Sequence, residues 1–260
     1  MTEVLVVGGG AAGCELAWGL ARRGRAAVLL TTSLDTLYAL PADTWPADPP
    51  TATLWSRIAA EAAGDPGAAG GTAQRAGPLR RAAKRELERL ERLRVVQSNA
   101  TALWRVGEEV VGVRTWEGPP ARAAVTVLAV GSFLGARLAL GPVVEHAGRL
   151  SEMAYDDLRD DLLAGGVRLR RHEVALAGDA VTPPYRVTYD VLEAGELAPL
   201  VVGGRTVVGA GRVRRWRGLW CVGACAGDVG LEAAAAAGRD LAVHLDGVLA
   251  LRRPTDAPRA

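Results

Sequence analysis

Residues 4–30, VLVVGGGAAGCELAWGLARRGRAAVLL, decide the fold of this 260-residue chain. The run Val4–Val7 is typical of a buried parallel strand, because it is short, continuous and rich in valine. Ala12–Arg23 has the composition of a helix, and Gly24 takes the position that commonly follows a helix C-terminus. Ala26–Leu30 is a second buried strand. The pattern predicts a βαβ unit of about 30 residues and therefore a parallel sheet.

The loop between the first strand and the helix contains only small residues, namely Gly8, Gly9, Gly10, Ala11, Ala12 and Gly13. Its G-x-G-x-x-G spacing allows a tight turn, a close approach of the backbone to a pyrophosphate, and close packing of helix on strand. The helix N-terminus adds free N–H groups and a partial positive charge. The alternative is a glycine-rich turn without a ligand, but the flanking strands and helix favour a dinucleotide site.

The end of the second strand departs from the usual pattern. An acidic residue normally binds the ribose hydroxyls there, whereas this chain has Thr31 and Thr32, with Asp35 slightly too late. The threonine hydroxyls can bond a ribose less strongly than a carboxylate would. Hydroxyls at a strand end also cap loops, which is the alternative interpretation.

The composition bounds the class of protein. The length fits one large domain, or one domain that carries a smaller lobe. The net charge of +2 is too small to indicate a nucleic-acid or membrane partner by itself. Three cysteines without close pairs and three scattered histidines indicate no disulfide framework and no metal site. We expect a cytoplasmic protein without a signal peptide or membrane span.

The middle of the chain contains two predicted helices followed by predicted strands. Leu54–Ala63 and Leu79–Leu93 are expected to be helices, separated by a loop over residues 64–78. Arg94–Gln97, residues 101–116 and Ala124–Val130 predict a strand, a β-meander and another buried strand. The charges of helix 79–93 can touch phosphates, but a solvated face laced with Glu–Arg pairs is the favoured interpretation.

The last motif lies near the C-terminus. Gly218–Val222 is a buried strand that ends in glycine, and a helix rich in alanine follows over Val229–Val248. A second helix N-terminus that points inward suits an electron-rich ring, such as a flavin. An ordinary terminal βα unit packed on the sheet is an equally good interpretation of these residues alone.

Six segments together resemble the GidA family, FAD-dependent enzymes that modify the wobble uridine of tRNA. They are VLVVGGGAAGCELA (4–17), LLTTSLDT (29–36), RVVQSNATAL (94–103), VVGVRTWEG (110–118), VLAVGSFLGARLALG (127–141) and GLWCVGACAGDVGLEAAAAAG (218–238). They occur in the family's order, and the family also has a threonine-containing LLT segment at the end of the second strand.

The resemblance implies an α/β fold with a Rossmann-like FAD-binding domain of the glutathione-reductase type, a β-meander and a small inserted lobe. We expect residues 1–141 and 213–250 to form the FAD domain. The short β-like segments indicate a small lobe or insertion over residues 142–212, and the composition of residues 251–260 predicts a disordered tail. The resemblance also implies further cofactor contacts: Ala100 near the adenine, Gly131 at a strand end, and Gly223, Ala224, Asp228, Val229, Gly230 and Leu231 near the ribityl chain and flavin ring.

The chain also departs from the family. The family's tRNA enzymes are considerably longer, and their cysteine-containing Asn-Pro segment is replaced here by residues 38–51, YALPADTWPADPPT. The resemblance therefore implies an FAD-binding protein, and we expect an oxidoreductase of unspecified substrate.

Three other functions stay open. A truncated tRNA-modifying enzyme with a partner protein is kept open by the basic helix 79–94 and by Arg212, Arg214, Arg215 and Arg217. A flavin-binding subunit without catalytic activity is the second, and a protein that binds NAD alone is the third. The C-terminal GLWCVG segment argues against the last.

One catalytic residue is suggested. Cys225 falls in the loop predicted beside the flavin, where a redox thiol would be useful. Cys221 lies four residues earlier, so the pair is not a CxxC motif, and both are better interpreted as small buried fillers. Cys14, within the first helix, is interpreted as a packing residue.

Overall fold

The computed structural model describes residues 2–39, 50–64, 72–177, 183–227 and 229–251. Its centre is a seven-stranded sheet in the order β14-β15-β16-β7-β1-β2-β3. Five neighbouring strands are parallel: β16 (Leu219–Val222), β7 (Val125–Leu128), β1 (Val4–Val7), β2 (Ala27–Thr31) and β3 (Leu93–Gln97). The antiparallel strands β14 (Leu197–Val202) and β15 (Arg205–Val213) extend the sheet at one end. The predicted α/β fold is confirmed.

The βαβ unit at the N-terminus forms as predicted. Helix α1 (Ala11–Arg22) connects β1 to β2, and Val4 lies opposite Ala27 in the parallel register. Each residue of β1 and β2 is buried. An uninterrupted apolar strand results because both faces of this sheet are covered.

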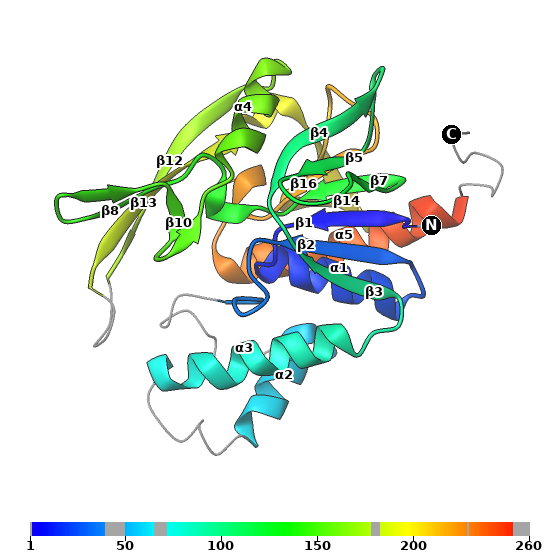
Figure 1. Cartoon of the computed structure of the whole chain (residues 1–260). Helices are drawn as coiled ribbons and strands as arrows, with labels where there is room; N and C mark the ends of the chain where they lie inside the picture. Colours follow the sequence, from blue (N-terminus) through cyan, green and yellow to red (C-terminus); the bar gives the residue numbers. More distant parts are fainter. Residues whose placement is uncertain (1, 40–49, 65–71, 178–182, 228, 252–260) are drawn as a thin grey trace.

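Different elements cover the two faces of the sheet (Figure 1). Helices α1 and α5 (Leu231–Leu251) pack on one face, where Val4 and Val6 enter the core. The meander β4 (Ala100–Val106), β5 (Glu109–Thr115) and β6 (Ala121–Arg122) covers the other, where Leu5 and Val7 point. Alternate side chains of a strand point to opposite faces, so one strand serves both cores.

Helices α1 and α5 approach closely because small residues meet at their crossing. A Cβ atom on Gly238 would lie 2.3 Å from the carbonyl oxygen of Ala12, and one on Gly19 would lie 2.9 Å from the Ala242 Cβ. The two helix N-terminal regions are therefore fixed against each other.

A second group of strands forms a lobe beside the central sheet (Figure 1). Its sheet has the order β12-β13-β8-β9, with β8 (Arg137–Leu140), β9 (Val143–Glu145), β12 (Leu169–Leu176) and β13 (Tyr185–Leu192). The hairpin β10 (Ala147–Arg149) and β11 (Glu152–Met153) and helix α4 (Asp156–Ala164) complete this region. The division at residues 142–212 remains a prediction. Strand pairing argues for moving both boundaries, since β8 pairs within the lobe and β14 within the central sheet.

The helical hairpin differs from its prediction in two respects. Helix α2 (Leu54–Ala63) has the predicted bounds, but α3 (Thr72–Glu88) begins within the segment expected to be a loop, and Pro78 lies inside it. A proline lacks an N–H donor, yet the buried side chains of Leu79, Ala83 and Leu87 hold the helix on the core. The helix ends before Leu93, which pairs with Ala27 as the first residue of β3.

The remaining differences are small. The short 3-10 helices η2 (Gly131–Phe133), η3 (Ala194–Glu196) and η4 (Ala224–Ala226) follow strand ends. Leu251 is the last residue of α5 rather than the first of the predicted tail, and residues 252–260 lie outside the described part. Within the described residues, no helix is long and apolar enough to cross a membrane.

Candidate functional site

The glycine loop between β1 and α1 contains two glycines that the fold itself requires. Gly8 has a φ of +115°, and a Cβ atom there would lie 2.3 Å from the carbonyl oxygen of Ala129. A Cβ atom on Gly13 would lie 2.0 Å from the carbonyl oxygen of Gly8. Close backbone packing therefore accounts for glycine at both positions, whether or not a ligand is bound.

Gly10 has a different environment. It is exposed, it forms the N-cap of α1, and a Cβ atom there would meet nothing within 4 Å. No side chain caps this helix, and its first turn contains no acidic residue. The first N–H groups of a helix have no partner within the helix, and they carry a partial positive charge. The start of α1 is therefore an open cradle that suits an anion such as a pyrophosphate.

The two threonines at the end of β2 are not equivalent. The buried Thr31 hydroxyl donates to the carbonyl of Ser33 (3.1 Å) and accepts from the Ser33 N–H (3.4 Å). A Cβ atom on Gly9 would lie 2.6 Å from this hydroxyl. Thr31 therefore shapes the loop, whereas Thr32 is only half-buried. Of the two threonines, Thr32 is therefore the more accessible to solvent.

A second loop of the predicted site follows β7. Gly131 has a φ of +56°, and a Cβ atom there would meet nothing within 4 Å. As at Gly10, no other atom of the described residues lies close to where a side chain would begin. Because β1 and β7 are neighbouring parallel strands, their carboxyl ends place Gly131 and the glycine loop at the same edge of the sheet.

The loop that follows β16 lies at the same edge of the sheet as the glycine loop and the loop after β7. Gly223 has a φ of +83°, and a Cβ atom there would lie 3.1 Å from the Cβ of Ala12, in the first turn of α1. Ala224 begins η4, while Gly230 and Leu231 lead into α5. Val229 packs beside Gly209, where a Cβ atom would lie 2.9 Å from its Cγ1. Asp228 lies outside the described residues. Ligands of open α/β sheets bind at the carboxyl ends of the strands, and three of the predicted segments meet there.

Ala100 lies apart from these loops, at the start of β4. Its side chain is fully buried and faces the core beneath the meander, so only its backbone is available to a ligand. The preceding Ser98 and Asn99 are buried polar residues that sequence analysis missed. The Ser98 N–H donates to the carbonyl of Thr31 (2.9 Å), which ties this turn to the end of β2.

Glu15 supports the site from beneath, and sequence analysis missed it as well. This fully buried carboxylate accepts hydrogen bonds from the hydroxyl of Tyr38 (2.8 Å) and from the N–H groups of Leu54 and Trp55 (3.3 and 3.2 Å). Arg239 of α5 lies 3.4 Å away. One side chain thus links α1, the loop after β2, the start of α2 and α5. The sequence does contain a signal for this role: a single acidic residue within an otherwise apolar helix is buried only when it has polar partners.

The structure brings two of the three cysteines together. The sulfur atoms of Cys221 and Cys225 are 3.4 Å apart, and both side chains are fully buried. Cys14 lies separately, and its thiol donates to the carbonyl of Gly9 (3.1 Å). Burial raises the pKa of Cys14 to about 12. Among the described residues, no group of three histidine, cysteine or acidic side chains is placed to hold a metal ion.

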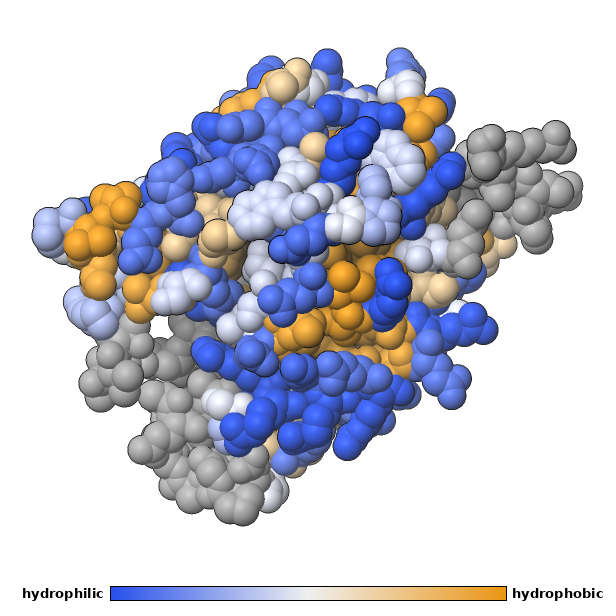
Figure 2. Space-filling model, viewed as in Figure 1, coloured by the Kyte–Doolittle hydropathy of each residue, from blue (hydrophilic) through white to orange (hydrophobic). Residues whose placement is uncertain are grey.

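Two cations of α3 are paired with acids on other elements. Arg85 bonds Glu61 of α2 (2.6 Å), and Lys84 lies 3.5 Å from Asp35. The surface in this region is predominantly hydrophilic (Figure 2). The sequence predicts Glu–Arg pairs at helical spacing along this helix, whereas these ion pairs of the described residues join α3 to other elements.

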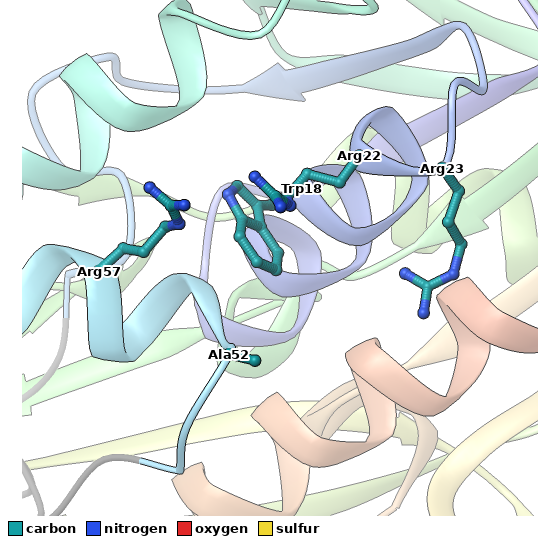
Figure 3. A pocket seen from close by; sticks show the side chains of 5 residues that line it. All are labelled: Trp18, Arg22, Arg23, Ala52 and Arg57. Carbon is teal, nitrogen blue, oxygen red and sulfur yellow. The ribbon is translucent and has the colours of Figure 1, made fainter.

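One hollow of about 420 Å³ lies away from the strand ends. It is lined by Trp18, Arg22, Arg23, Ala52 and Arg57, and Figure 3 shows Trp18 between Arg22 and Arg57. Trp18 is eight residues beyond Gly10 along α1, which is about 12 Å at the rise of a helix. The hollow is therefore not part of the cradle formed by the glycine loop.

Comparison with known proteins identifies relatives of this chain in both sequence and structure. The profile of the family described as glucose inhibited division protein A (GidA) matches residues 3–44 and 53–177. A GidA-related protein from Thermus thermophilus has a crystal structure with 40% sequence identity. Its TM-score is 0.80, and the match covers 94% of this chain and 97% of that one.

More distant relatives are longer. The Aquifex aeolicus GidA structure has a TM-score of 0.73 at 16% identity, and covers 98% of this chain and 64% of its own. The tRNA uridine 5-carboxymethylaminomethyl modification enzyme MnmG of Thermus thermophilus is 31% identical over 218 residues. That match covers 75% of this chain but 35% of MnmG, so the chain spans about a third of that relative. The structural likeness confirms the Rossmann-like fold of the glutathione-reductase type.

Proposed function

Because the chain belongs to the GidA family, a family of FAD-binding proteins, we propose that it binds FAD at the carboxyl edge of its parallel sheet. The observation that carries the proposal is the exposed, uncapped start of α1 at Gly10, at the sheet edge where the half-buried Gly131 also lies. Both positions leave room for a ligand against the backbone, and the helix N-terminus favours a bound anion.

Each loop has a separate role in this proposal. Gly9, Gly10, Ala11 and Ala12 hold the pyrophosphate through backbone N–H groups, and Gly8 and Gly13 allow the turn. Thr32 contacts the ribose, supported by Thr31, and the backbone at Ala100 meets the adenine. Gly131 and the segment from Gly223 to Leu231 bound the ribityl chain and the flavin ring.

The flavin would supply hydride or electron transfer, so we propose an oxidoreductase. Backbone groups of glycine and alanine bind a cofactor but do not identify a substrate or an electron donor. Location in the cytoplasm remains a prediction.

We do not expect this chain by itself to have the tRNA-modifying activity named for the MnmG relatives. The chain spans about a third of the MnmG length, and Lys84 and Arg85 of α3 are paired with acids. A truncated tRNA-modifying enzyme would bind tRNA with an affinity that falls steeply with salt. We expect no such binding.

The proposal is tested by the absorption spectrum of the protein purified without added cofactor, and again after incubation with FAD and gel filtration. Flavin bands that travel with the protein are expected. A folded protein that stays colourless after incubation with FAD would overturn the proposal. A yellow protein that no donor reduces and no acceptor reoxidises would indicate a binding subunit instead of an enzyme.

A further inference from the structure

The buried cysteines 221 and 225 lie directly behind two loops of the proposed flavin site. Cys221 is in β16, opposite Leu128 of β7, and Cys225 is in η4, next to Ala224. The Cys225 thiol lies 3.4 Å from the carbonyl oxygen of Val222 and 3.6 Å from that of Leu128. The pair therefore occupies the space between the ends of β7 and β16.

The two sulfur atoms are in contact, which ordinary packing of small side chains does not require. Their separation is 3.4 Å, and a disulfide bond is about 2.05 Å long. An approach of about 1.4 Å closes the bond.

The two thiols are electrostatically different. The hydrogen bond from Cys221, together with backbone N–H groups of Gly131 and Val130, lowers the pKa of Cys225 against the effect of burial. The same hydrogen bond, followed by burial, raises the pKa of Cys221. Cys225 is thus the more acidic thiol of the pair, and such an asymmetry suits thiol–disulfide chemistry.

We propose that Cys221 and Cys225 form a dithiol–disulfide couple that exchanges two electrons with the bound FAD. This inference rests on the proposed function. Both S–H bonds break, one S–S bond forms, and two electrons and two protons pass to oxidised FAD, giving FADH2. Both thiols are fully buried, which shields them from dissolved oxidants, and Cys225 belongs to the segment proposed to bound the flavin ring, so a bound flavin would supply the electron acceptor. The couple stores a second pair of electrons beside the cofactor.

Counting thiols and electrons in the FAD-loaded protein tests this couple. The air-oxidised holoprotein is denatured in iodoacetamide and weighed by mass spectrometry. We expect one labelled cysteine of the three, and three after prior reduction. Anaerobic titration with dithionite should consume about four electrons per FAD, because flavin and disulfide each accept about two.

The variants Cys225→Ser and Cys14→Ala form a matched comparison, because Cys14 is equally buried but has no partner cysteine among the described residues. Cys225→Ser should lose the disulfide and consume about two electrons, whereas Cys14→Ala should keep about four. If Cys225→Ser fails to fold, the wild-type counts still decide the question.

Different failures have different meanings. A yellow wild-type protein with three labelled thiols, or one that consumes only two electrons, refutes the couple and leaves the proposed function standing. A folded protein that binds no FAD refutes the proposed function and the couple with it.

Discussion

The substitution Gly10→Asp separates cofactor binding from folding. Gly10 has φ −74° and ψ −177°, an extended conformation that any residue adopts, and a Cβ atom there meets nothing within 4 Å. Aspartate is among the preferred N-cap residues, because its side chain accepts a hydrogen bond from the first turn. Since no side chain caps α1 in the native protein, and glycine is itself a tolerated N-cap residue, the free energy of unfolding of the apoprotein should rise by about 0.3 kcal/mol.

The same carboxylate should oppose FAD. It occupies the N–H groups that the pyrophosphate needs, and it places a negative charge beside a negative ligand. Two unit charges about 5 Å apart repel by about 3 kcal/mol at an effective dielectric constant of about 20. This repulsion should raise the dissociation constant of FAD about a hundredfold, which means weaker binding. Gly10→Ala is the matched control, since it adds a methyl group without charge and should change the stability by about 0.5 kcal/mol or less.

The assay has two parts. Urea denaturation compares the three apoproteins, and titration with FAD, followed by the change in flavin fluorescence, compares their affinities. A folded Gly10→Asp protein that binds FAD as tightly as the wild type would show that the pyrophosphate does not lie at the start of α1.

Three further predictions concern the frame of the site. Gly13→Ala should lower the free energy of unfolding by about 3 kcal/mol, because its Cβ would lie 2.0 Å from the carbonyl oxygen of Gly8; Gly247→Ala, where a Cβ meets nothing, should not, and equal urea midpoints would contradict this. Glu15→Ala should cost about 3–5 kcal/mol in the same experiment, since Tyr38, the start of α2 and Arg239 lose their buried acceptor; a loss below about 1 kcal/mol would show that the network can rearrange. Burial raises the pKa of Cys14 from 9.0 to about 12, so its contribution to stability is full below pH 9 and is lost between pH 9 and 12. Thermal unfolding over this range should show a shallower decline for Cys14→Ala than for the wild type, and parallel curves would exclude the effect.

The central sheet could be predicted from the sequence because its strands are apolar throughout. Val4–Val7 and Ala27–Thr31 are buried on both faces, a condition that produces a short uninterrupted apolar run. Helix α3 shows the limit of such local patterns. Pro78 indicates a break, but the packing of Leu79 and Leu87 on the core outweighs the lost hydrogen bond.

The glycine loop could be located in the sequence, but the contacts between distant segments could not. The spacing of Gly8, Gly10 and Gly13 follows from a local turn, and all three lie at one strand end. By contrast, the link from Glu15 to Trp55 spans 40 residues and depends on how α2 packs. The approach of Cys221 to Cys225 depends on the turn at Gly223, whose positive φ no pattern of side chains specifies.

The backbone, more than the side chains, builds the proposed cofactor site, and this explains how a chain that matches about a third of MnmG can contain it. The carboxyl ends of β1, β7 and β16 are aligned by parallel pairing, and the crossing of α1 and α5 at Ala12 and Gly238 fixes the two helix starts. None of these contacts needs a residue from a further domain. A substrate, by contrast, must be recognised by side chains, which these backbone contacts do not supply. We therefore expect the substrate selectivity of the proposed oxidoreductase to come from side chains outside the glycine loop.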